Sequence, residues 1–417
     1  MTSIFRYCLF LAVVLSPAGL SAQDYRFDRT ISPEVLKNYL ARSITMLDLL
    51  TEQGDLADNL RMLTSSGAKF AGRTVYLWGH EAEFPRRLEL AKKNVPKIHQ
   101  ADPDLVLQAC IFEIVSRGVE QIAVPEWAFT TLGQPVEQRN FRYAEMIYPD
   151  GRGHNQWGQD ASVPDISRVE TKLWFYTLAV SYLDAGIEAL HFGQAEIMNA
   201  NDADSEHWWQ LLALVRAYAA QHARRHLVLC DAHVPSGGLL RQGHLLFDFH
   251  SFPLRIEEVP DRPQQGVLRV GFVDSIYGRS RGGIAPSGWR CEHLPYLVEL
   301  DNWGASDRPG QPRVGGCWVW GYDEISWFAH QSRDYRNRWL RYAWDWVRQH
   351  DPDGFLQMPG SRCLHSPVDG QSWYFANMPS AAVPNGFGQE DTIREIWAGD
   401  RQNGVAPRSV NSRFATE

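Results

Sequence analysis

The sequence predicts an α/β fold, a (β/α)8 TIM barrel with a long loop after its third strand and a short C-terminal extension. Apolar runs of strand character alternate with helical segments, which is typical of a parallel sheet. There are eight such runs, the strand number of a TIM barrel. A doubly wound open sheet is the alternative, but it usually has a Gly-rich turn after its first strand, and none is visible. The predicted strands are 43–50, 73–81, 104–113, 187–193, 226–233, 244–250, 296–301 and 317–323.

The first 22 residues predict a secretory signal peptide. Arg6 is their only charge, an apolar run follows it, and Leu20-Ser21-Ala22 provides small residues for cleavage before Gln23. The run is too short for a good transmembrane span. No later stretch is apolar enough to cross a membrane, so we expect a periplasmic or secreted protein without a membrane partner.

The helical segments between the strands support the alternation. Ser32-Pro33 is a good helix start, because a capping residue precedes proline at the first helical position. A break is possible at Pro96, and Ser205 is the expected cap of the strongest helix. Regular helices are missing after strands five, six and seven. The predicted helices are 55–67, 83–100, 167–186, 205–223 and 332–351.

Three regions complete the predicted organisation. Residues 33–351 form the barrel, and residues 352–417 form an extension packed on it, followed by a loose tail. Residues 117–163 form the long loop after strand three, which we expect to cover part of the catalytic mouth. Five of its aromatic side chains are candidates to wall a substrate groove: Trp127, Phe129, Tyr143, Tyr148 and Trp157.

Composition excludes some functions and favours others. The formal net charge of −8, without a basic block, argues against a nucleic-acid partner. The cysteines after the signal peptide are odd in number and lack a C-x-x-C, which suits neither a disulfide scaffold nor a zinc ribbon, although Cys291 and Cys317 could pair. Sixteen tryptophans favour a carbohydrate partner, because aromatic rings stack on the apolar faces of sugars.

Polar side chains collect where the predicted strands end, and in a barrel these ends meet at the face that holds the active site. Solvated loop acids around a barrel with its site elsewhere are the ordinary alternative. Beside two catalytic candidates, Glu196 and Glu299, the expected substrate-binding residues are Trp78, His80, Glu113, His191, Gln194, Asp231, His233, His250, Asp301, Trp320 and Asp323.

Paired carboxylates on a sugar-stacking face suggest glycoside hydrolysis, in which one acid protonates the leaving oxygen and the other attacks the anomeric carbon or activates water. The serine stretches "PSG" (235–237) and "PSGW" (286–289) lack the G-x-S-x-G nucleophile elbow, which argues against a serine hydrolase. We expect neither a cofactor nor a metal.

The stretches "HFGQAE" and "YLVELDNW" carry a resemblance to the TIM-barrel retaining glycoside hydrolases often called clan A. The resemblance covers roughly residues 43–350. It implies Glu196, at the end of strand four, as the acid/base and Glu299, at the end of strand seven, as the nucleophile of a retaining enzyme. Members of that clan usually have Asn directly before the acid/base, whereas this chain has Ala195. Glu113, Asp231 and Asp301 are further candidates.

Two other functions remain open. His80, His233, His250 and Asp323 are residue types that bind divalent metals in barrel metallohydrolases. That match lacks an H-x-H on strand one and a lysine on strand four. A glycan-binding barrel without catalysis is the third possibility.

Overall fold

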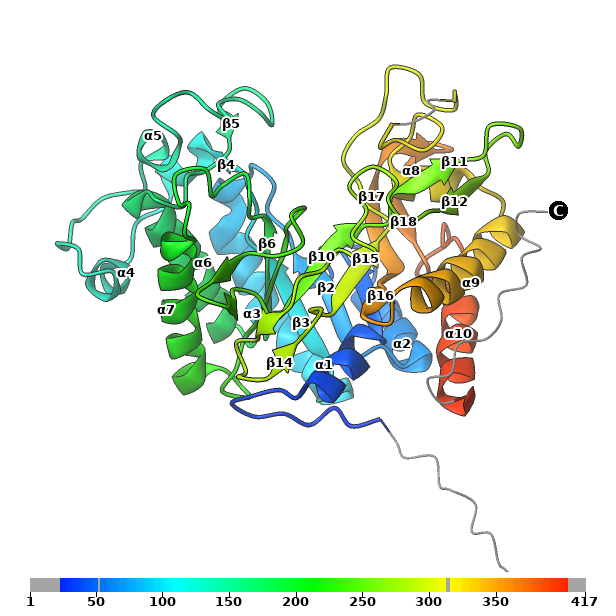
Figure 1. Cartoon of the computed structure of the whole chain (residues 1–417), viewed down its shortest axis with the longest axis horizontal. Coiled ribbons are helices and arrows are strands. Elements are labelled where there is room, and N and C mark those ends of the chain that lie inside the picture. The colour runs from blue at the N-terminus through cyan, green and yellow to red at the C-terminus, as the bar shows by residue number, and fades with distance from the viewer. Residues whose placement is uncertain (1–22, 52, 313–315, 404–417) are drawn as a thin grey trace, which may run out of the picture.

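A ten-stranded sheet forms the centre of the molecule (Figure 1). The computed structural model describes residues 23–51, 53–312 and 316–403, so the expected signal peptide and the last part of the expected tail lie outside the described residues. In sheet order the strands are β16 (Gly354–Leu356), β15 (Tyr296–Glu299), β10 (Phe249–Pro253), β7 (Leu229–His233), β6 (Ala189–Gln194), β3 (Val106–Cys110), β2 (Phe70–Val75), β1 (Ser43–Met46), β17 (Met358–Val368) and β18 (Gln371–Phe375).

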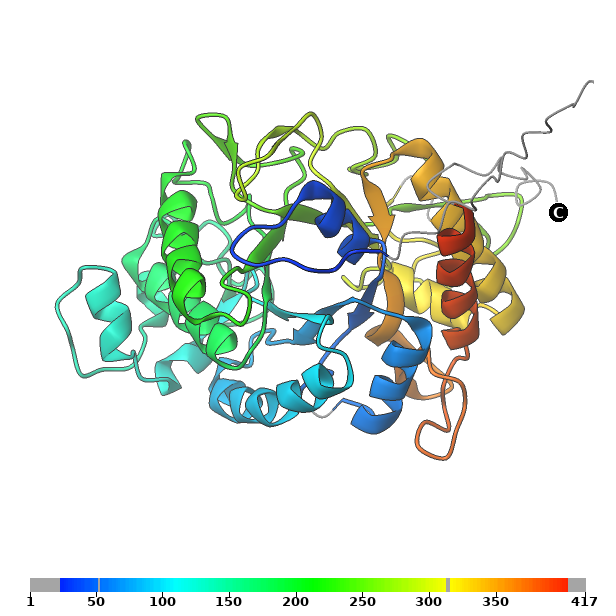
Figure 2. The ribbon, with the colours of Figure 1, turned by 90° about the horizontal axis from the view of Figure 1, so that it is seen from below.

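The sheet is curled (Figure 2), and one chain segment connects β15, near one end of the strand order, with β1, near the other end. β16 pairs in parallel with β15, and β17 pairs in parallel with β1. Only Gln357 separates β16 from β17, and its backbone N–H donates to the carbonyl of Val298 at 2.8 Å. The segment that contains β16 and the start of β17 therefore has β15 as one neighbour and β1 as the other.

Helix α1 (Pro33–Leu40) covers the amino ends of the strands (Figure 2). Its start is as predicted, because the Ser32 side chain accepts a hydrogen bond from the backbone N–H of Val35 and proline follows the cap. The apolar side chains of α1 belong to one buried cluster with the first or second residues of seven strands. Those strand residues are Phe70, Val106, Ala189, Leu229, Phe249, Leu297 and Phe355.

The longer helices lie outside the sheet. Asp55 caps α2 and Gly67, at φ 81°, ends it, whereas α3 continues through Pro96. Ser205 precedes α7 as predicted, but its side chain makes no cap bond, and the carboxylate of Asp202 accepts from the first turn instead. These helices are α2 (Leu56–Ser66), α3 (Phe84–Ala101), α6 (Val169–Asp184), α7 (Glu206–His222), α8 (Glu324–His330), α9 (Arg333–His350) and α10 (Glu390–Asn403).

Strands and helices do not alternate all the way round. Residues 234–295, which follow β7 and include β10, contain no helix. The fold is therefore mixed α/β with a large curled parallel sheet.

Short helices and strands lie in the connections between the main elements. They are η1 (Glu81–Glu83), β4 (Val115–Ser116), η2 (Arg117–Gln121), α4 (Glu126–Thr131), α5 (Tyr143–Met146), β5 (Ala161–Ser162), β8 (Leu240–Arg241), β9 (His244–Leu245), β11 (Ile256–Glu258), β12 (Gly266–Leu268), β13 (Gly283–Ile284) and β14 (Arg290–Cys291).

The eighth strand was predicted in the wrong place. Residues 317–323 form only an isolated bridge between Val319 and Tyr322, because the chain turns at positive φ at Trp320 and Gly321. The place beside β1 is taken by β17, from the segment that we assigned to a C-terminal extension. Proline and glycine in that segment argue against a strand. Gly360 is required there by packing, because a Cβ on it would lie 2.4 Å from the sulfur of Met46.

Two other strands begin and end differently from the prediction. β2 ends at Val75, so residues 76–81 leave the sheet instead of extending it. β10 begins at Phe249 rather than at residue 244, because His244 and Leu245 pair with β8 in a small separate sheet. Both shifts move polar side chains relative to the cavity described next.

Two further findings concern membrane spans and cysteines. Helices that combine the length and the apolar character needed to cross a bilayer are not found in the described part of the chain. Cys291 carries a free thiol, so the pairing with Cys317 that we considered is not formed.

Candidate active site

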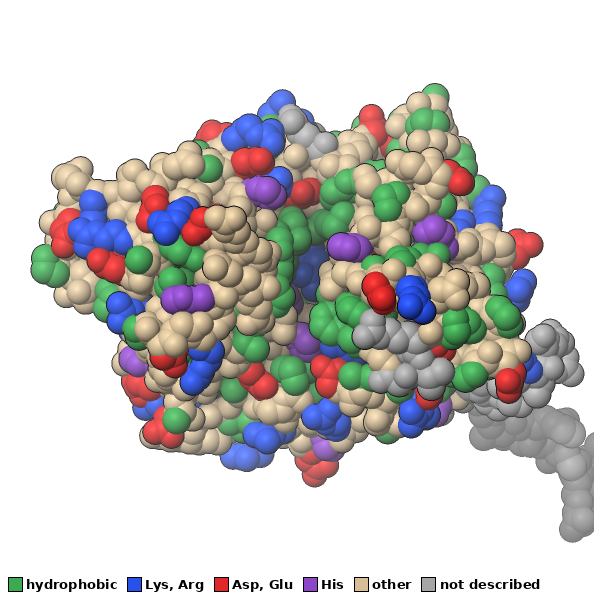
Figure 3. Space-filling view, turned by 90° about the horizontal axis from the view of Figure 1, so that it is seen from above, with side chains coloured by type: hydrophobic (Ala, Val, Ile, Leu, Met, Phe, Trp, Pro, Cys, Tyr) green, Lys and Arg blue, Asp and Glu red, His purple; other side chains and the backbone are tan. Residues whose placement is uncertain are grey.

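A cavity of about 600 Å³ opens at the carboxyl ends of the parallel strands. Figure 3 shows this face hollowed near its centre, with hydrophobic side chains along the hollow. Every strand of the parallel set except β16 contributes to the lining, either directly or through a residue within three positions of its end. These contributions include Leu47, Arg73, Phe112, Glu113, His191, Gln194, His233, Ser251, Phe252, Glu299 and Arg362.

Glu299, the last residue of β15, lies in the cavity between two arginines and is 3% exposed. Arg362 donates from Nη1 to its Oε2 at 2.6 Å, and Arg73 donates to both of its oxygens. The hydroxyl of Thr45 donates to Oε2 at 3.0 Å. Burial alone would raise the pKa of Glu299, but the two guanidinium groups outweigh it and hold the pKa at about 2. Glu299 is therefore a carboxylate at every physiological pH.

The two arginines are themselves fixed. Arg362, on β17, also donates from Nη2 to Asp301 at 2.5 Å. Arg73 has a φ of 60° inside β2, an unfavourable conformation for a side chain of this size, and its backbone N–H donates to Gln108. Carboxylates beside both guanidinium groups raise their pKa further above the usual range. Strain at Arg73 and the burial of four charged groups make this cluster a candidate functional site.

Glu113, which follows β3, is a second buried carboxyl in the cavity, 4% exposed. Gln194 donates to it twice, from the backbone N–H at 3.0 Å and from the side-chain amide at 2.8 Å. Neither donor is charged. The approach depends on Gly193, because a Cβ there would lie 1.8 Å from Oε2 of Glu113 and the φ of Gly193 is +54°.

Aromatic rings form the wall beside Glu113. Trp78 packs edge to face against Phe112 and against Trp157, with ring centroids 5.3 Å apart in each pair. The indole N–H of Trp157 donates to the backbone carbonyl of Glu113 at 2.9 Å. Trp157 comes from the long connection after β3. It is one of the five aromatic residues proposed to wall a groove, and it lines the cavity. Phe129, Tyr143 and Tyr148 are buried in the core instead.

His191 lies on β6 at the floor of the cavity, 3% exposed. Its Nδ1 lies 2.7 Å from Oδ2 of Asp231, which is fully buried below the cavity on β7. Asp231 also accepts hydrogen bonds from Gln108 at 2.6 Å and from Ser251 at 2.5 Å. The carboxylate therefore orients the imidazole ring.

The opposite wall carries a third arginine. Arg255 forms an ion pair with Asp274 and lies over the ring of Trp303, 4.9 Å from its centroid. Burial and the charge of Arg255 together lower the pKa of His233 to about 4, so His233 is neutral at pH 7. Glu324 accepts hydrogen bonds from the backbone N–H groups of Leu254, Arg255 and Asp301, and it thereby joins the ends of β10 and β15.

The structure gathers seven of the thirteen sequence-derived candidates around the cavity, and Asp231 lies directly beneath it. Glu196 does not line the cavity, and its carboxylate accepts a hydrogen bond from the backbone N–H of Ser236. The residues that do line it are Trp78, Glu113, His191, Gln194, His233, Glu299 and Asp301.

The other four candidates also lie outside the cavity lining. His80 is exposed before η1. His250 is fully buried, and neither ring nitrogen has a hydrogen-bond partner in the described part of the chain. Trp320 donates to the carbonyl of Gln265, and Asp323 caps α8 by accepting from the N–H of Ser326. These positions follow from the altered ends of β2 and β10 and from the missing strand at 317–323.

Arg73, Arg255 and Arg362 are cavity residues that the sequence reasoning missed. Arg73 and Arg362 lie within short apolar runs, "FAGRTV" and "MPGSRCL". A charge inside a buried strand is costly unless a partner neutralises it, so an arginine in such a run is a signal for a carboxylate nearby. Arg255 lies two residues beyond the end of β10 and gave no such signal.

Among residues 23–51, 53–312 and 316–403, no group of three or more His, Cys, Asp or Glu side chains is placed to hold a metal ion. His80, His233, His250 and Asp323, the residues behind the metallohydrolase alternative, occupy the separate positions given above.

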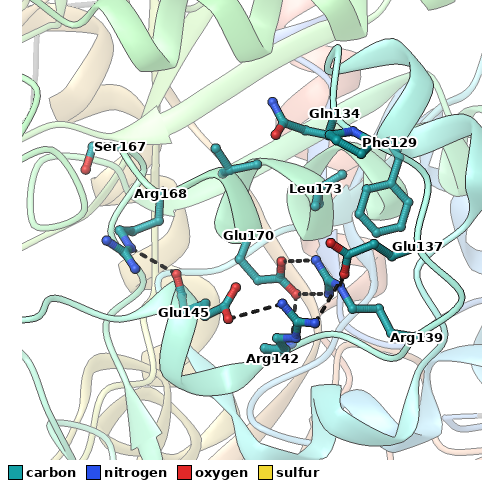
Figure 4. A pocket seen from close by; sticks show the side chains of 12 residues that line it. Phe129, Gln134, Glu137, Arg139, Arg142, Glu145, Ser167, Arg168, Glu170 and Leu173 are labelled. Atoms are coloured by element: carbon teal, nitrogen blue, oxygen red, sulfur yellow. Dashed lines mark hydrogen bonds and ion pairs between the residues drawn. The ribbon is translucent and has the colours of Figure 1, made fainter.

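A second cavity, of about 450 Å³, lies beside the connection after β3 (Figure 4). Its charged side chains neutralise one another. Arg139 donates to both oxygens of Glu170 at 2.7 and 2.8 Å, and Arg142 contacts Glu137 and Glu145. These ion pairs fold the connection against α6. The central cavity is therefore the stronger candidate for chemistry.

Comparison with known proteins identified no matching family model and no matching curated protein. Similar solved structures include the cyclic α-maltosyl-(1→6)-maltose hydrolase from Arthrobacter globiformis in complex with maltose (10% identity, TM-score 0.49, 89% of this chain and 85% of that chain). The Nostoc punctiforme debranching enzyme in its native form is similar at 11% identity and a TM-score of 0.45, covering 89% of this chain and 82% of that chain.

A third similar structure is the isomalto-dextranase of Arthrobacter globiformis T6 complexed with panose. The identity is 8% and the TM-score 0.35, over 86% of this chain and 56% of that chain. The solved structures that this chain resembles are thus glycoside hydrolases. The three TM-scores are below 0.5, so these likenesses carry no argument about the function of this chain.

Proposed function

We propose that this protein is a glycoside hydrolase that cleaves a glycosidic bond of an oligo- or polysaccharide in the central cavity. The observation that carries the proposal is the contrast between two carboxyl groups in one aromatic-walled cavity. Glu299 is held ionised by Arg73 and Arg362, whereas Glu113 is bound only by uncharged donors of Gln194. Glycosidases need two carboxyl groups whose surroundings give them different roles.

Glu299 is the carboxylate that faces the positive charge developing at the anomeric carbon. Because its pKa is about 2, it keeps its charge throughout the reaction. Glu113 is the second carboxyl, which transfers a proton to the leaving oxygen. It takes the role that the sequence resemblance gave to Glu196, because Glu113 lines the cavity and Glu196 does not. Trp78 and Trp157 stack on the sugar beside Glu113.

We also propose that the curled sheet is a closed eight-stranded parallel barrel. The pairing of β16 with β15 and of β17 with β1 supports closure. In such a barrel the catalytic groups lie at the carboxyl ends of the strands, as the cavity does here.

Retention of the anomeric configuration, which the sequence resemblance implies, remains a prediction. NMR of the first-formed anomer distinguishes retention from inversion. Export to the periplasm or the medium is likewise proposed from the residues of the N-terminal segment. Mass spectrometry of the mature protein tests it, with a first residue at Gln23 as the expected result.

The test of the catalytic proposal compares four variants against a panel of neutral oligosaccharides. E299Q and E113Q should each lose nearly all reducing-sugar release while still binding the glycan in calorimetry. E120Q, at an exposed ion pair with Arg117, is the matched control and should keep full activity. If E196Q loses activity while E113Q keeps it, the assignment from the sequence resemblance is correct and ours is wrong. Wild-type binding without turnover on any glycan would support the non-catalytic alternative.

A further inference from the structure

The hydrogen bonds around Asp231 fix which nitrogen of His191 carries a proton. Gln108 donates to Oδ1 of Asp231 and Ser251 donates to Oδ2. Asp231 has no exposed surface, so water does not supply other donors. A carboxylate only accepts hydrogen bonds, and Nδ1 of His191 lies 2.7 Å from it. Nδ1 therefore carries the hydrogen and donates it to Asp231.

The same arrangement leaves Nε2 of His191 with a free lone pair. The ring lines the cavity, and its Nε2 forms no hydrogen bond with any residue that the structure describes. Phe112 packs edge to face against the ring, with centroids 5.7 Å apart, and this contact limits rotation of the ring. An imidazole whose Nδ1 is held by a carboxylate, with its other ring nitrogen unoccupied in a cavity, is the arrangement of a general base.

Carboxylates lie on two sides of His191. Asp231 on β7 contacts the ring directly, and Glu299 on β15 interacts with its charge. His233 also interacts with the charge of His191, and burial together with the charge of Arg255 lowers its pKa to about 4, so it is neutral at pH 7. Arg73 and Arg362, which bind Glu299, are cations of the same cavity.

We propose that His191 is the base that removes the proton from the attacking water, with Asp231 as its positioning residue. The inference rests on the glycoside hydrolase function proposed above. One O–H bond of the water breaks and the proton goes to Nε2, while the water oxygen forms the bond to the anomeric carbon. The bond from that carbon to its leaving group breaks, and the leaving oxygen keeps that electron pair. Asp231 stays a carboxylate throughout.

The kinetic test uses H191N. The asparagine amide retains a donor toward Asp231 but has nothing at the position of Nε2. We expect kcat to fall by about 10²- to 10⁴-fold, the usual contribution of a general base, with little change in KM. Azide has no proton to remove, so it should restore turnover of H191N and give a glycosyl azide. H226N is the matched control, because His226 forms the same Nδ1 contact to an aspartate, Asp28, at an exposed site away from the cavity.

A second measurement does not depend on turnover. In wild-type protein labelled with ¹⁵N-histidine, NMR should show His191 protonated on Nδ1, and its signal is identified by its loss in H191N. Protonation on Nε2 instead would overturn the proposal. A rise in KM at unchanged kcat, or no azide rescue, would also overturn it and make His191 a sugar contact. Absence of hydrolysis by the wild-type enzyme on every glycan overturns the proposed function itself, whereas the other results leave that function standing.

Discussion

Arg362 on β17 donates to Glu299 on β15 at 2.6 Å, and both side chains are almost fully buried. The two strands are not neighbours in the sheet. β16 pairs with β15 but not with β17, and β1 pairs with β17 but not with β15. The ion pair therefore spans the interior of the curled sheet and connects the region where its two sides meet. Two features of the cavity depend on Arg362: it helps to hold Glu299 ionised and it binds Asp301.

Replacing Arg362 tests how far this pair sets the charge of Glu299. The folded-state pKa of Glu299, about 2, is below its usual value of 4.5, so its stabilising contribution is complete above about pH 4.5 and is lost as the pH falls toward 2. In R362Q the pKa should rise. The acid limb of the kcat/KM profile should then move to higher pH, and the free energy of unfolding at pH 7 should fall by about 3–5 kcal/mol.

R341Q serves as the control, since Arg341 pairs with Glu395 at the surface and such pairs contribute about 0–1 kcal/mol. Denaturant titration and the pH profile are measured on both variants. An unchanged acid limb in folded R362Q would show that Arg73 alone holds Glu299 ionised.

Substitution of Gly193 should displace Glu113. An alanine Cβ would lie 1.8 Å from Oε2 of Glu113, and the backbone φ of +54° adds strain of about 1–3 kcal/mol. We expect G193A to fold but to lose most hydrolysis. G133A separates the two effects, because Gly133 has a similar φ of +65° with nothing within 4 Å of the added Cβ. Equal losses of activity in both variants would contradict a role for the close approach to Glu113.

Removing the charge of Asp323 should stabilise the protein at high pH. Burial raises its pKa from 3.8 to about 7, so the folded state binds a proton that the unfolded state releases, and stability falls as the pH rises from about 4 to 7. D323N keeps a capping side chain for α8 and removes the ionisation. We expect a gain on the order of 2–4 kcal/mol at pH 8 and little change at pH 4. D55N, the same exchange at the exposed cap of α2, is the control; an equal gain there would rule out this explanation.

Truncation of Trp157 should weaken glycan binding. Its ring packs against Trp78, and its N–H holds the backbone carbonyl of Glu113. W157A should raise the Kd for oligosaccharide by about tenfold or more, equal to about 1.4 kcal/mol, in calorimetry on an E299Q background. Trp127 comes from the same connection but does not line the cavity. The W127A variant is therefore the control and should bind the oligosaccharide with unchanged affinity. Equal affinity of both variants would contradict a stacking role for Trp157.

Local signals made much of the fold predictable. The cap and proline at Ser32-Pro33, the glycine that ends α2 and the long amphipathic repeat of α9 each depend on neighbours within a few residues. Five strands were found near their predicted positions because their apolar runs are continuous. The strand predicted at 317–323 was wrong. The backbone there turns at Trp320 and Gly321, both at positive φ, and the composition of the apolar run does not reveal this turn.

The candidate site was only partly predictable, for a related reason. Glu299, Glu113 and His191 were recognisable as polar residues at strand ends. Their grouping in one cavity required the strands to be in one curled sheet with their carboxyl ends together. Glu196 is only two residues beyond Gln194, yet it leaves the cavity because β6 ends at Gln194 and the chain turns. One or two residues of shift at a strand end decide which side chains enter the cavity.

The sequence by itself determined the alternation of helices and strands, the acidic surface without a basic block and the enrichment of acids, histidines and tryptophans at strand ends. Only the tertiary structure decided that β16 and β17 lie between β15 and β1, and that Arg73 and Arg362 meet at Glu299. Propensity and periodicity act over a few residues, and a sequence displays them directly. Contacts such as Arg362 with Glu299, 63 positions apart, and Arg73 with Glu299, 226 positions apart, form only when long-range strand pairing brings the chain segments together.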